Sequence, residues 1–203
     1  MTNPRQSATA PGVLENRRPE RQEAMSEPEA RDAAGDSEEA PLPTSPEALH
    51  ARLDALGIRY TAVSHPPVFT VEEAKALRGE LPGSHIKNLF LRNKKGRMWL
   101  VTCLEDREID LKQLGERLEA GRFSFGSADR LMTYLGVRPG AVTPFAVIND
   151  KDGAVTMVLD SGVMSEGPVN CHPLVNTMTT ALAPADLVRF LEAEGHGPLM
   201  LDF

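Results

Sequence analysis

The sequence predicts an α+β fold built on a mixed β-sheet. Predicted strands are joined in hairpins over 85–104 and 145–159, and single helices lie between and after them without strict βαβ alternation. The first 43 residues contain no Phe, Tyr, Trp or Ile and are rich in Pro, Glu and Ala. Such a segment buries too little apolar surface to offset its ordering entropy. We therefore expect a disordered acidic tail over 1–43 and one domain over 44–203.

Helix starts are marked by capping residues. Ser45 and Pro46 predict a helix that ends at Gly57, and a capping box over 70–73 predicts a second helix, to about residue 77. The remaining helices are predicted over 111–118, 127–135 and 184–194.

Strands are predicted from apolar alternation between turn signals. A weak strand over 58–63 comes first, and two strands then flank a turn that contains Gly96. The later strands are predicted over 145–149 and 154–159, paired around a turn at 150–153, and over 175–179 after a loop.

One lysine lies in the middle of the apolar strand over 85–92. Side chains alternate across a strand, so Lys87 shares a face with Leu89 and Leu91, while Asn88 points to the other face. Because lysine is almost never fully buried without a partner, Lys87 needs a solvent outlet or an anionic ligand. The strand alone leaves two interpretations open: a lysine that reaches solvent at the sheet edge, or a fixed cation aimed at a phosphate or a carbonyl that gains negative charge.

Three segments, His85–Leu91, Gly136–Phe145 and Asn170–Thr179, together resemble the YbaK/EbsC family of aminoacyl-tRNA editing domains. The nearest resemblance is to its free-standing prolyl-tRNA editing branch, called PrdX or ProXp-ala, and it runs from about Pro43 to the C-terminus. The resemblance implies a curled, barrel-like mixed sheet with helices packed outside. It also implies that hydrolysis depends on Lys87.

The resemblance implies roles for further residues, each with a structural alternative. Asn88 would contact the terminal adenosine or support the pocket wall, unless it is a polar residue facing a helix. His172 would limit the size of the bound amino acid or act as a general base, although a lone histidine is more often structural. Loop residues that would line the substrate site are Gly136, Gly140, Thr143, Gly162, Gly167, Asn176 and Thr177.

The two cysteines favour neither metal nor nucleophile. Cys103 and Cys171 form no disulfide framework and have no zinc-ligand spacing, so we predict no metal and no cofactor. Neighbouring side chains in an extended chain point in opposite directions, which disfavours a dyad of Cys171 with His172. His65, before two prolines, receives no role from the sequence.

Charge is unevenly distributed along the chain. The net charge is −7, and five Arg against nine Asp and Glu put −4 of it in the first 43 residues, which leaves −3 for the domain. This balance argues against broad, non-specific nucleic-acid binding. Basic residues gather at one predicted turn, either as a solvated turn or as contacts to a tRNA acceptor stem: Arg92, Lys94, Lys95 and Arg97. With no signal-peptide or membrane-spanning run, we expect a cytoplasmic protein that binds neither membranes nor DNA.

These observations and the resemblance lead to the hypothesis of a trans-editing hydrolase that deacylates Ala-tRNA(Pro). A synthetase pocket built for proline rejects alanine weakly, because missing apolar groups cost only about 1–3 kcal/mol. A water positioned by backbone groups and the substrate's ribose hydroxyl would attack the ester, and Lys87 would fix the nucleotide or stabilise the developing charge. The alternatives are a Cys-tRNA(Pro) deacylase, a non-catalytic module that binds aminoacyl-tRNA or a nucleotide, and a regulatory subunit whose tail recruits prolyl-tRNA synthetase.

Overall fold

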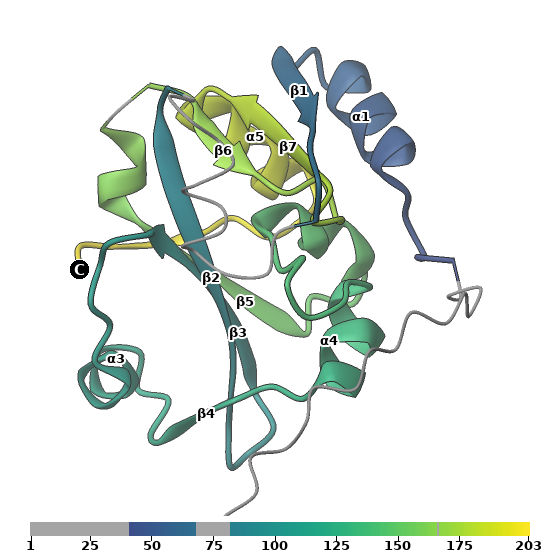
Figure 1. The fold of residues 1–203 in the computed structure, drawn as a ribbon. Coiled ribbons are helices and arrows are strands. Elements are labelled where there is room, and N and C mark those ends of the chain that lie inside the picture. The colour runs from purple at the N-terminus through teal and green to yellow at the C-terminus, as the bar shows by residue number, and fades with distance from the viewer. Residues whose placement is uncertain (1–40, 68–81, 166) are drawn as a thin grey trace, which may run out of the picture. The chain divides into compact units, whose positions relative to one another are not determined.

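The structure is a computed structural model that describes residues 41–67, 82–165 and 167–203 (Figure 1). The tail predicted over 1–43, apart from its last three residues, and the helix predicted from the capping box over 70–73 lie outside the described residues. Within the described ranges, no helix is both long and apolar enough to cross a membrane.

The described residues form one mixed sheet of eight strands in the order β1-β7-β6-β2-β3-β5-β8, with β4 paired to β2. Pairing is parallel between β2 and β6, β3 and β5, and β5 and β8, and antiparallel elsewhere. The predicted α+β class with a mixed sheet is confirmed. The strands are β1 (Tyr60–Ser64), β2 (Ser84–Asn93), β3 (Met98–Leu104), β4 (Phe123–Phe125), β5 (Val155–Asp160), β6 (Val169–Cys171), β7 (Met178–Leu182) and β8 (Leu199–Leu201).

Strand β2 organises the sheet because it changes partners along its length. On one edge it pairs with β3 from Ile86 to Arg92. On the other edge it pairs with β6 through its first two residues and with β4 through its last three. Figure 1 shows the consequence: β6, β7 and β1 gather at one end of β2, and β4 lies at the other.

The helices begin where the capping residues predicted. Ser45 Oγ accepts the Ala48 N–H at 3.2 Å, and Ser127 Oγ accepts the Arg130 N–H at 3.3 Å. Gly136, with a left-handed φ of 61°, ends the second of these helices. The helices are α1 (Pro46–Ala55), α3 (Leu111–Arg117), α4 (Ala128–Leu135), α5 (Pro184–Ala193) and the short 3-10 helices η1 (Pro144–Asn149) and η2 (Ser161–Met164).

The predicted second hairpin is wrong. Residues 145–149 form η1 instead of a strand, and β5 lies parallel to β3. Pro144 starts η1, and the Thr143 hydroxyl accepts the Phe145 N–H at 3.4 Å. The run is apolar and buried on every side, so its periodicity could not distinguish a helix from a strand. The strand predicted over 175–179 is shifted, since β7 begins at Met178.

Apolar side chains pack on both faces of the sheet. On one face Phe145 and Phe190 meet edge to face with centroids 5.2 Å apart, and Phe90 joins their cluster. On the other face Trp99 meets Phe123 in the same way at 5.0 Å. Because alternate residues of β2 enter different cores, Lys87 lies on the Trp99 face and Asn88 on the Phe145 face.

Candidate active site

Lys87 is half-buried on β2, and its Nζ donates to the backbone carbonyl of Arg107, in the loop after β3. An ammonium has three donors, so two remain for solvent or a ligand once this bond is made. Cys103 faces Lys87 across the strand pair. Burial raises the pKa of its thiol to about 11, although the neighbouring ammonium acts in the opposite direction. The thiol therefore stays protonated near neutral pH, and Lys87 supplies the charge.

A buried carboxylate holds the loop that receives Lys87. Asp160 ends β5 and is fully buried. It accepts the N–H groups of Gly162 at 2.8 Å and Leu104 at 3.3 Å, and it pairs with Arg107 Nε at 3.1 Å. Gly162 lies against this pair, where a Cβ would come within 2.8 Å of Arg107 Nη2. An unbroken chain of contacts thus runs from Asp160 through Arg107 to Lys87.

The side chain of Asn88 ties β2 to the loop after α4. Its Nδ2 donates to the Val142 carbonyl at 2.9 Å, and its Oδ1 accepts the Thr102 hydroxyl at 2.7 Å. The same loop carries three predicted site residues, Gly136, Gly140 and Thr143; Thr143 is fully buried and caps η1. The structure therefore brings Asn88 to this loop, on the face opposite to the Lys87 ammonium.

His172 lies in the loop between β6 and β7. Its Nδ1 donates to the Met178 carbonyl at 3.1 Å, so the neutral ring leaves the Nε2 lone pair available. Burial lowers the pKa of His172; the carbonyl bond opposes this shift, and His65 adds to it. His172 is therefore a neutral imidazole near neutral pH.

His65 is a neighbour of His172 that the sequence left without a role. The two ring centroids are 6.2 Å apart. His65 Nδ1 donates to the Pro66 carbonyl at 2.8 Å, so Nε2 of the neutral ring accepts the Thr179 hydroxyl at 2.9 Å. The pairing of β1 with β7 creates this contact between residues 114 positions apart, which no local signal reveals.

The backbone after His172 is strained. Leu174 has φ of +69° and is buried, although a branched side chain disfavours this region. Its N–H donates to the His172 carbonyl at 3.0 Å, and the Thr177 carbonyl accepts the His65 N–H at 2.9 Å. Asn176 belongs to the same loop. The loop that presents His172 is thus held in one conformation from both ends.

The parallel register of β2 and β6 brings the histidine loop towards Lys87. Ser84 pairs with Val169 and His85 with Asn170, and continuing this register puts His172 level with Lys87. In the described part of the chain, neither β6 nor β4 pairs with β2 between Ile86 and Leu89, so this stretch of the sheet edge has no strand partner, and the Phe90 carbonyl accepts the Gly126 N–H at 2.8 Å.

Gly167 serves the strand pair that leads to this stretch of the sheet edge. A Cβ on Gly167 would lie 3.3 Å from Gly83 Cα, so the two backbones approach closely where β2 and β6 begin. This close approach of two backbones accounts for a glycine at position 167 by packing alone.

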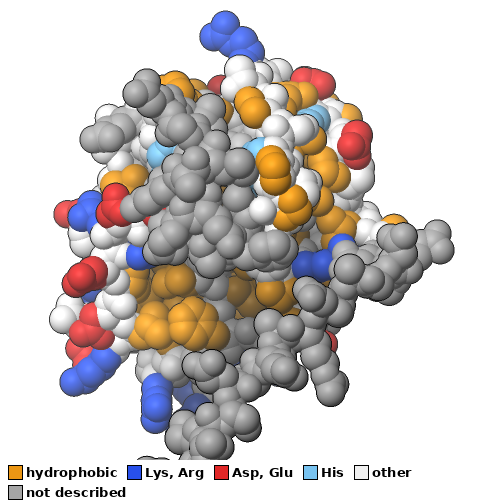
Figure 2. Space-filling model, in the orientation of Figure 1, with side chains coloured by type: hydrophobic (Ala, Val, Ile, Leu, Met, Phe, Trp, Pro, Cys, Tyr) orange, Lys and Arg blue, Asp and Glu red, His pale blue; other side chains and the backbone are white. Residues whose placement is uncertain are grey.

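The basic hairpin tip lies apart from Lys87. Asn93 Oδ1 accepts the N–H groups of Lys95 at 3.0 Å and Arg97 at 3.1 Å, and the Arg97 guanidinium lies 5.1 Å from the Trp99 ring centroid. Figure 2 shows Lys and Arg side chains at the lower edge of the molecule, where Figure 1 draws this hairpin tip. Six residues of strand separate the tip from Lys87, or about 20 Å. The structure therefore does not bring Arg92, Lys94, Lys95 and Arg97 into the Lys87 site.

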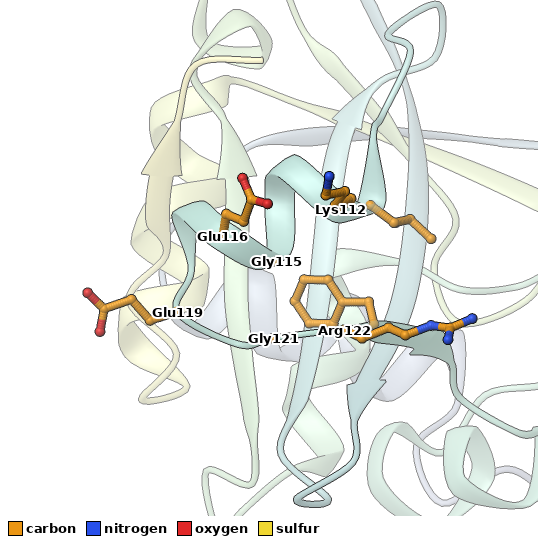
Figure 3. A pocket seen from close by; sticks show the side chains of 8 residues that line it. Lys112, Gly115, Glu116, Glu119, Gly121 and Arg122 are labelled. Atoms are coloured by element: carbon orange, nitrogen blue, oxygen red, sulfur yellow. The ribbon is translucent and has the colours of Figure 1, made fainter.

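A separate pocket of about 700 Å³ opens between α3 and the turn before β4. Figure 3 shows its Glu119 and Arg122 side chains pointing away from each other. It contains none of the predicted site residues, and its polar groups do not converge on a ligand position. Among the described residues, no group of three or more His, Cys, Asp or Glu is arranged to hold a metal ion.

Comparison with known proteins gives concordant matches. The family described as "Aminoacyl-tRNA editing domain" matches residues 65–190. "Prolyl-tRNA synthetase associated domain-containing protein 1" of Mus musculus is 43% identical over 160 residues, 76% of this chain and 94% of that protein. "Prolyl-tRNA editing protein ProX" of Acetoanaerobium sticklandii is 40% identical over 151 residues, 74% of this chain and 92% of that protein.

Solved structures share the fold. One described as a candidate trans-editing enzyme for prolyl tRNA synthetase superposes with a TM-score of 0.61 at 19% identity, covering 77% of this chain and 94% of its own. Another, a protein of undescribed function, superposes with a TM-score of 0.62 at 21% identity, covering 76% of this chain and 97% of its own. At these identities the likeness is one of fold.

Proposed function

The chain belongs to the family of aminoacyl-tRNA editing domains, and from this premise we propose that it removes alanine from mischarged tRNA(Pro). The resemblance predicted from the sequence is confirmed, and the chain is an aminoacyl-tRNA deacylase of the prolyl-tRNA editing type. Alanine as the amino acid and tRNA(Pro) as its carrier are our proposal.

One observation carries the site assignment: an ammonium fixed by a backbone carbonyl, on a stretch of sheet edge with no strand partner among the described residues, with a neutral histidine level with it. We assign to Lys87 the stabilisation of negative charge on the ester carbonyl, or on the phosphate of the terminal nucleotide, as water attacks. Both cysteines are buried, and burial raises the pKa of each thiol, so in this proposal neither thiol attacks and water is the nucleophile.

His172 is assigned to the wall of the amino-acid pocket. The strained turn at Leu174 holds the imidazole in place, and a rigid wall excludes a larger side chain more strongly than an apolar pocket rejects a smaller one. Nε2 can also take a proton from the attacking water. In His172→Asn a polar side chain remains in the pocket wall, but the amide cannot accept a proton near neutral pH. The variant should therefore retain alanine selectivity if the residue acts as a wall, and lose kcat if it acts as a base.

The test is deacylation of Ala-tRNA(Pro), Cys-tRNA(Pro) and Pro-tRNA(Pro) by the wild type, by Lys87→Ala and by Lys151→Ala. Lys151 is a matched control because its side chain is 71% exposed and pairs with Glu194. We expect rapid loss of alanine only, abolished in Lys87→Ala and unchanged in the control. Hydrolysis of the cysteinyl ester instead would assign the protein to that related activity. If all three esters survive, the enzyme proposal fails.

We further propose that the domain over 44–203 is sufficient for hydrolysis and that the tail over 1–43 recruits prolyl-tRNA synthetase. Thr44 Oγ1 donates to Asn149 Oδ1 at 2.7 Å, which supports a boundary at this point. A chain that starts at Pro43 should keep full deacylation and lose co-purification with the synthetase.

A tRNA substrate is consistent with the expected cytoplasmic location. In this proposal the basic tip contacts tRNA phosphates, and the backbone of the loop with Asn176 and Thr177 orients the aminoacyl adenosine.

A further inference from the structure

Strand β4 carries the most exposed large apolar side chain of the described residues. Phe125 is 62% exposed, whereas Phe123, two residues earlier, is buried against Trp99. Residues two apart in a strand point to the same face. Phe125 therefore extends the aromatic row of this face from the core into solvent, where packing does not require it.

The face that carries Phe125 also carries Lys87. Phe125 pairs with Leu91 of β2, and Lys87 lies four residues before Leu91 on the same face. Four residues of about 3.3 Å and one strand spacing of about 4.8 Å put Phe125 and Lys87 about 14 Å apart. A bound molecule that contacts both must be elongated.

Cations lie on the hairpin-tip side of the exposed ring, beyond Phe123, which pairs with Asn93. Arg97 lies on the same face, over Trp99. Arg122 directly precedes β4, and Lys94 and Lys95 are exposed at the hairpin tip. Figure 2 shows hydrophobic side chains in the lower part of the view with Lys and Arg side chains below them. On a domain with a net charge of −3, this local positive region is where a polyanion can approach.

We propose that Phe125 is a stacking platform for an unpaired base near the 3′ end of the tRNA, while the ester at that end reaches Lys87. An exposed aromatic ring with cations on the side away from Lys87 fits single-stranded RNA, because the ring stacks on a base and the cations bind phosphates further along the strand. At about 3.4 Å per stacked nucleotide, 14 Å corresponds to about four nucleotides, a length within the unpaired 3′ end of a tRNA. The inference rests on the proposed function and adds a substrate-binding residue to it.

The test measures KM and kcat for Ala-tRNA(Pro) with Phe125→Ala, Phe125→Leu and Phe125→Trp. Leu199→Ala is the control, since Leu199 is 48% exposed on β8 at the far edge of the sheet. We expect KM to rise about 5- to 100-fold in the Ala and Leu variants, with near wild-type values in the Trp variant and the control. A wild-type KM in Phe125→Leu would overturn the stacking role, because leucine keeps the apolar contact without the ring.

Binding of uncharged tRNA(Pro) separates this inference from the proposed function. By fluorescence anisotropy, Phe125→Ala should weaken binding without changing its salt dependence, whereas Lys94→Ala and Lys95→Ala should each reduce the salt slope. Unchanged binding and KM in Phe125→Ala, with active wild type, would overturn the inference alone. If Phe125→Ala loses the synthetase but binds tRNA normally, the surface belongs to a protein contact and the inference is wrong.

Discussion

Strand β5 begins after one buried aspartate, Asp150, and ends at another, Asp160, and the two carboxylates differ in what lies beyond them. Asp150 accepts the N–H groups of Ala154 at 3.0 Å and Val155 at 2.7 Å and bonds to His196 Nε2 at 2.9 Å. Asp160 likewise accepts two backbone N–H groups and one bond from a basic side chain. Local chemistry alone therefore does not distinguish them.

The Asp150 network closes within the scaffold. His196 is buried, and its Nδ1 donates to the Glu194 carbonyl at 2.9 Å, so both ring nitrogens are occupied. The Asp160 network instead continues through Arg107 to Lys87, whose ammonium has donors to spare. In the proposed mechanism, Asp160 therefore contributes to function because its contacts end at a group that can still bind a ligand, whereas those of Asp150 do not.

The largest expected effect comes from replacing the Lys87 ammonium, the group at which the contacts of Asp160 end. Lys87→Arg should lower kcat about 100-fold or more, because a planar guanidinium cannot aim the same donors at the Arg107 carbonyl and at the substrate. Steady-state deacylation measures it, with circular dichroism as the check on folding. Full activity in the arginine variant would mean that any cation at this position suffices.

A pair of isosteric variants tests the comparison itself. Asp160→Asn should lower kcat about 10- to 100-fold with little change in KM, because the loop that positions Lys87 relaxes. Asp150→Asn should leave kcat within about twofold. Both should lower the free energy of unfolding in urea by about 3 kcal/mol, since each replaces a buried carboxylate that accepts two backbone N–H groups and one side-chain bond. Equal losses of kcat would show that the two carboxylates are equivalent scaffold groups.

Chemical labelling distinguishes positioning from general destabilisation. In Asp160→Asn the Lys87 amine should react several-fold faster with an acylating reagent, measured by mass spectrometry against Lys151 as the internal reference. The same ratio in Asp150→Asn should equal that of the wild type.

Two glycines provide a smaller version of this contrast. Gly162→Ala places a Cβ 2.8 Å from Arg107 Nη2 and 3.1 Å from Asp160 Oδ1, so it should lower kcat about fivefold or more. Gly153, in the turn after Asp150, has φ of +65° with no atom within 4 Å of an added Cβ. Gly153→Ala should cost about 1 kcal/mol of unfolding free energy and no activity, measured by urea unfolding and deacylation. An active Gly162→Ala enzyme would contradict the role of the Arg107 loop.

The smallest effect is a pH dependence on the His172 side of the site. Burial lowers the folded-state pKa of His172, so the unfolded chain binds the proton more tightly. The stabilisation is complete above the unfolded value of about 6.5 and declines as pH falls below it, by at most about 1.4 kcal/mol per pH unit. Urea unfolding between pH 7.5 and 5.5 should show this decline, and His172→Asn should reduce it. Burial also lowers the pKa of His50, so His50→Asn measures the share of the decline that comes from that residue. An unchanged decline in His172→Asn would contradict the lowered pKa of His172.

Local signals were sufficient for α1, α3, α4 and α5, for the first hairpin and for the side-chain alternation of β2. The caps at Ser45 and Ser127 work as predicted because a cap is a contact between residues three apart. The placement of Lys87 and Asn88 on opposite faces follows from strand geometry alone. Three-residue strands such as β4 and β8 are too short to show a hydrophobic period, so no local pattern predicts that Phe125 lies in an exposed strand.

The sequence by itself determined the family, the α+β class and the lysine on which the proposed chemistry depends, because motifs, caps and alternation are properties of neighbouring residues. Only the tertiary structure decided that residues 145–149 are helical, that His65 joins His172, and that Asp160 reaches Lys87 through Arg107. Arg107 and Asp160 are 53 positions apart. Contacts at that separation form when parallel strands find their register through the packing of both faces at once, which no local window of sequence contains.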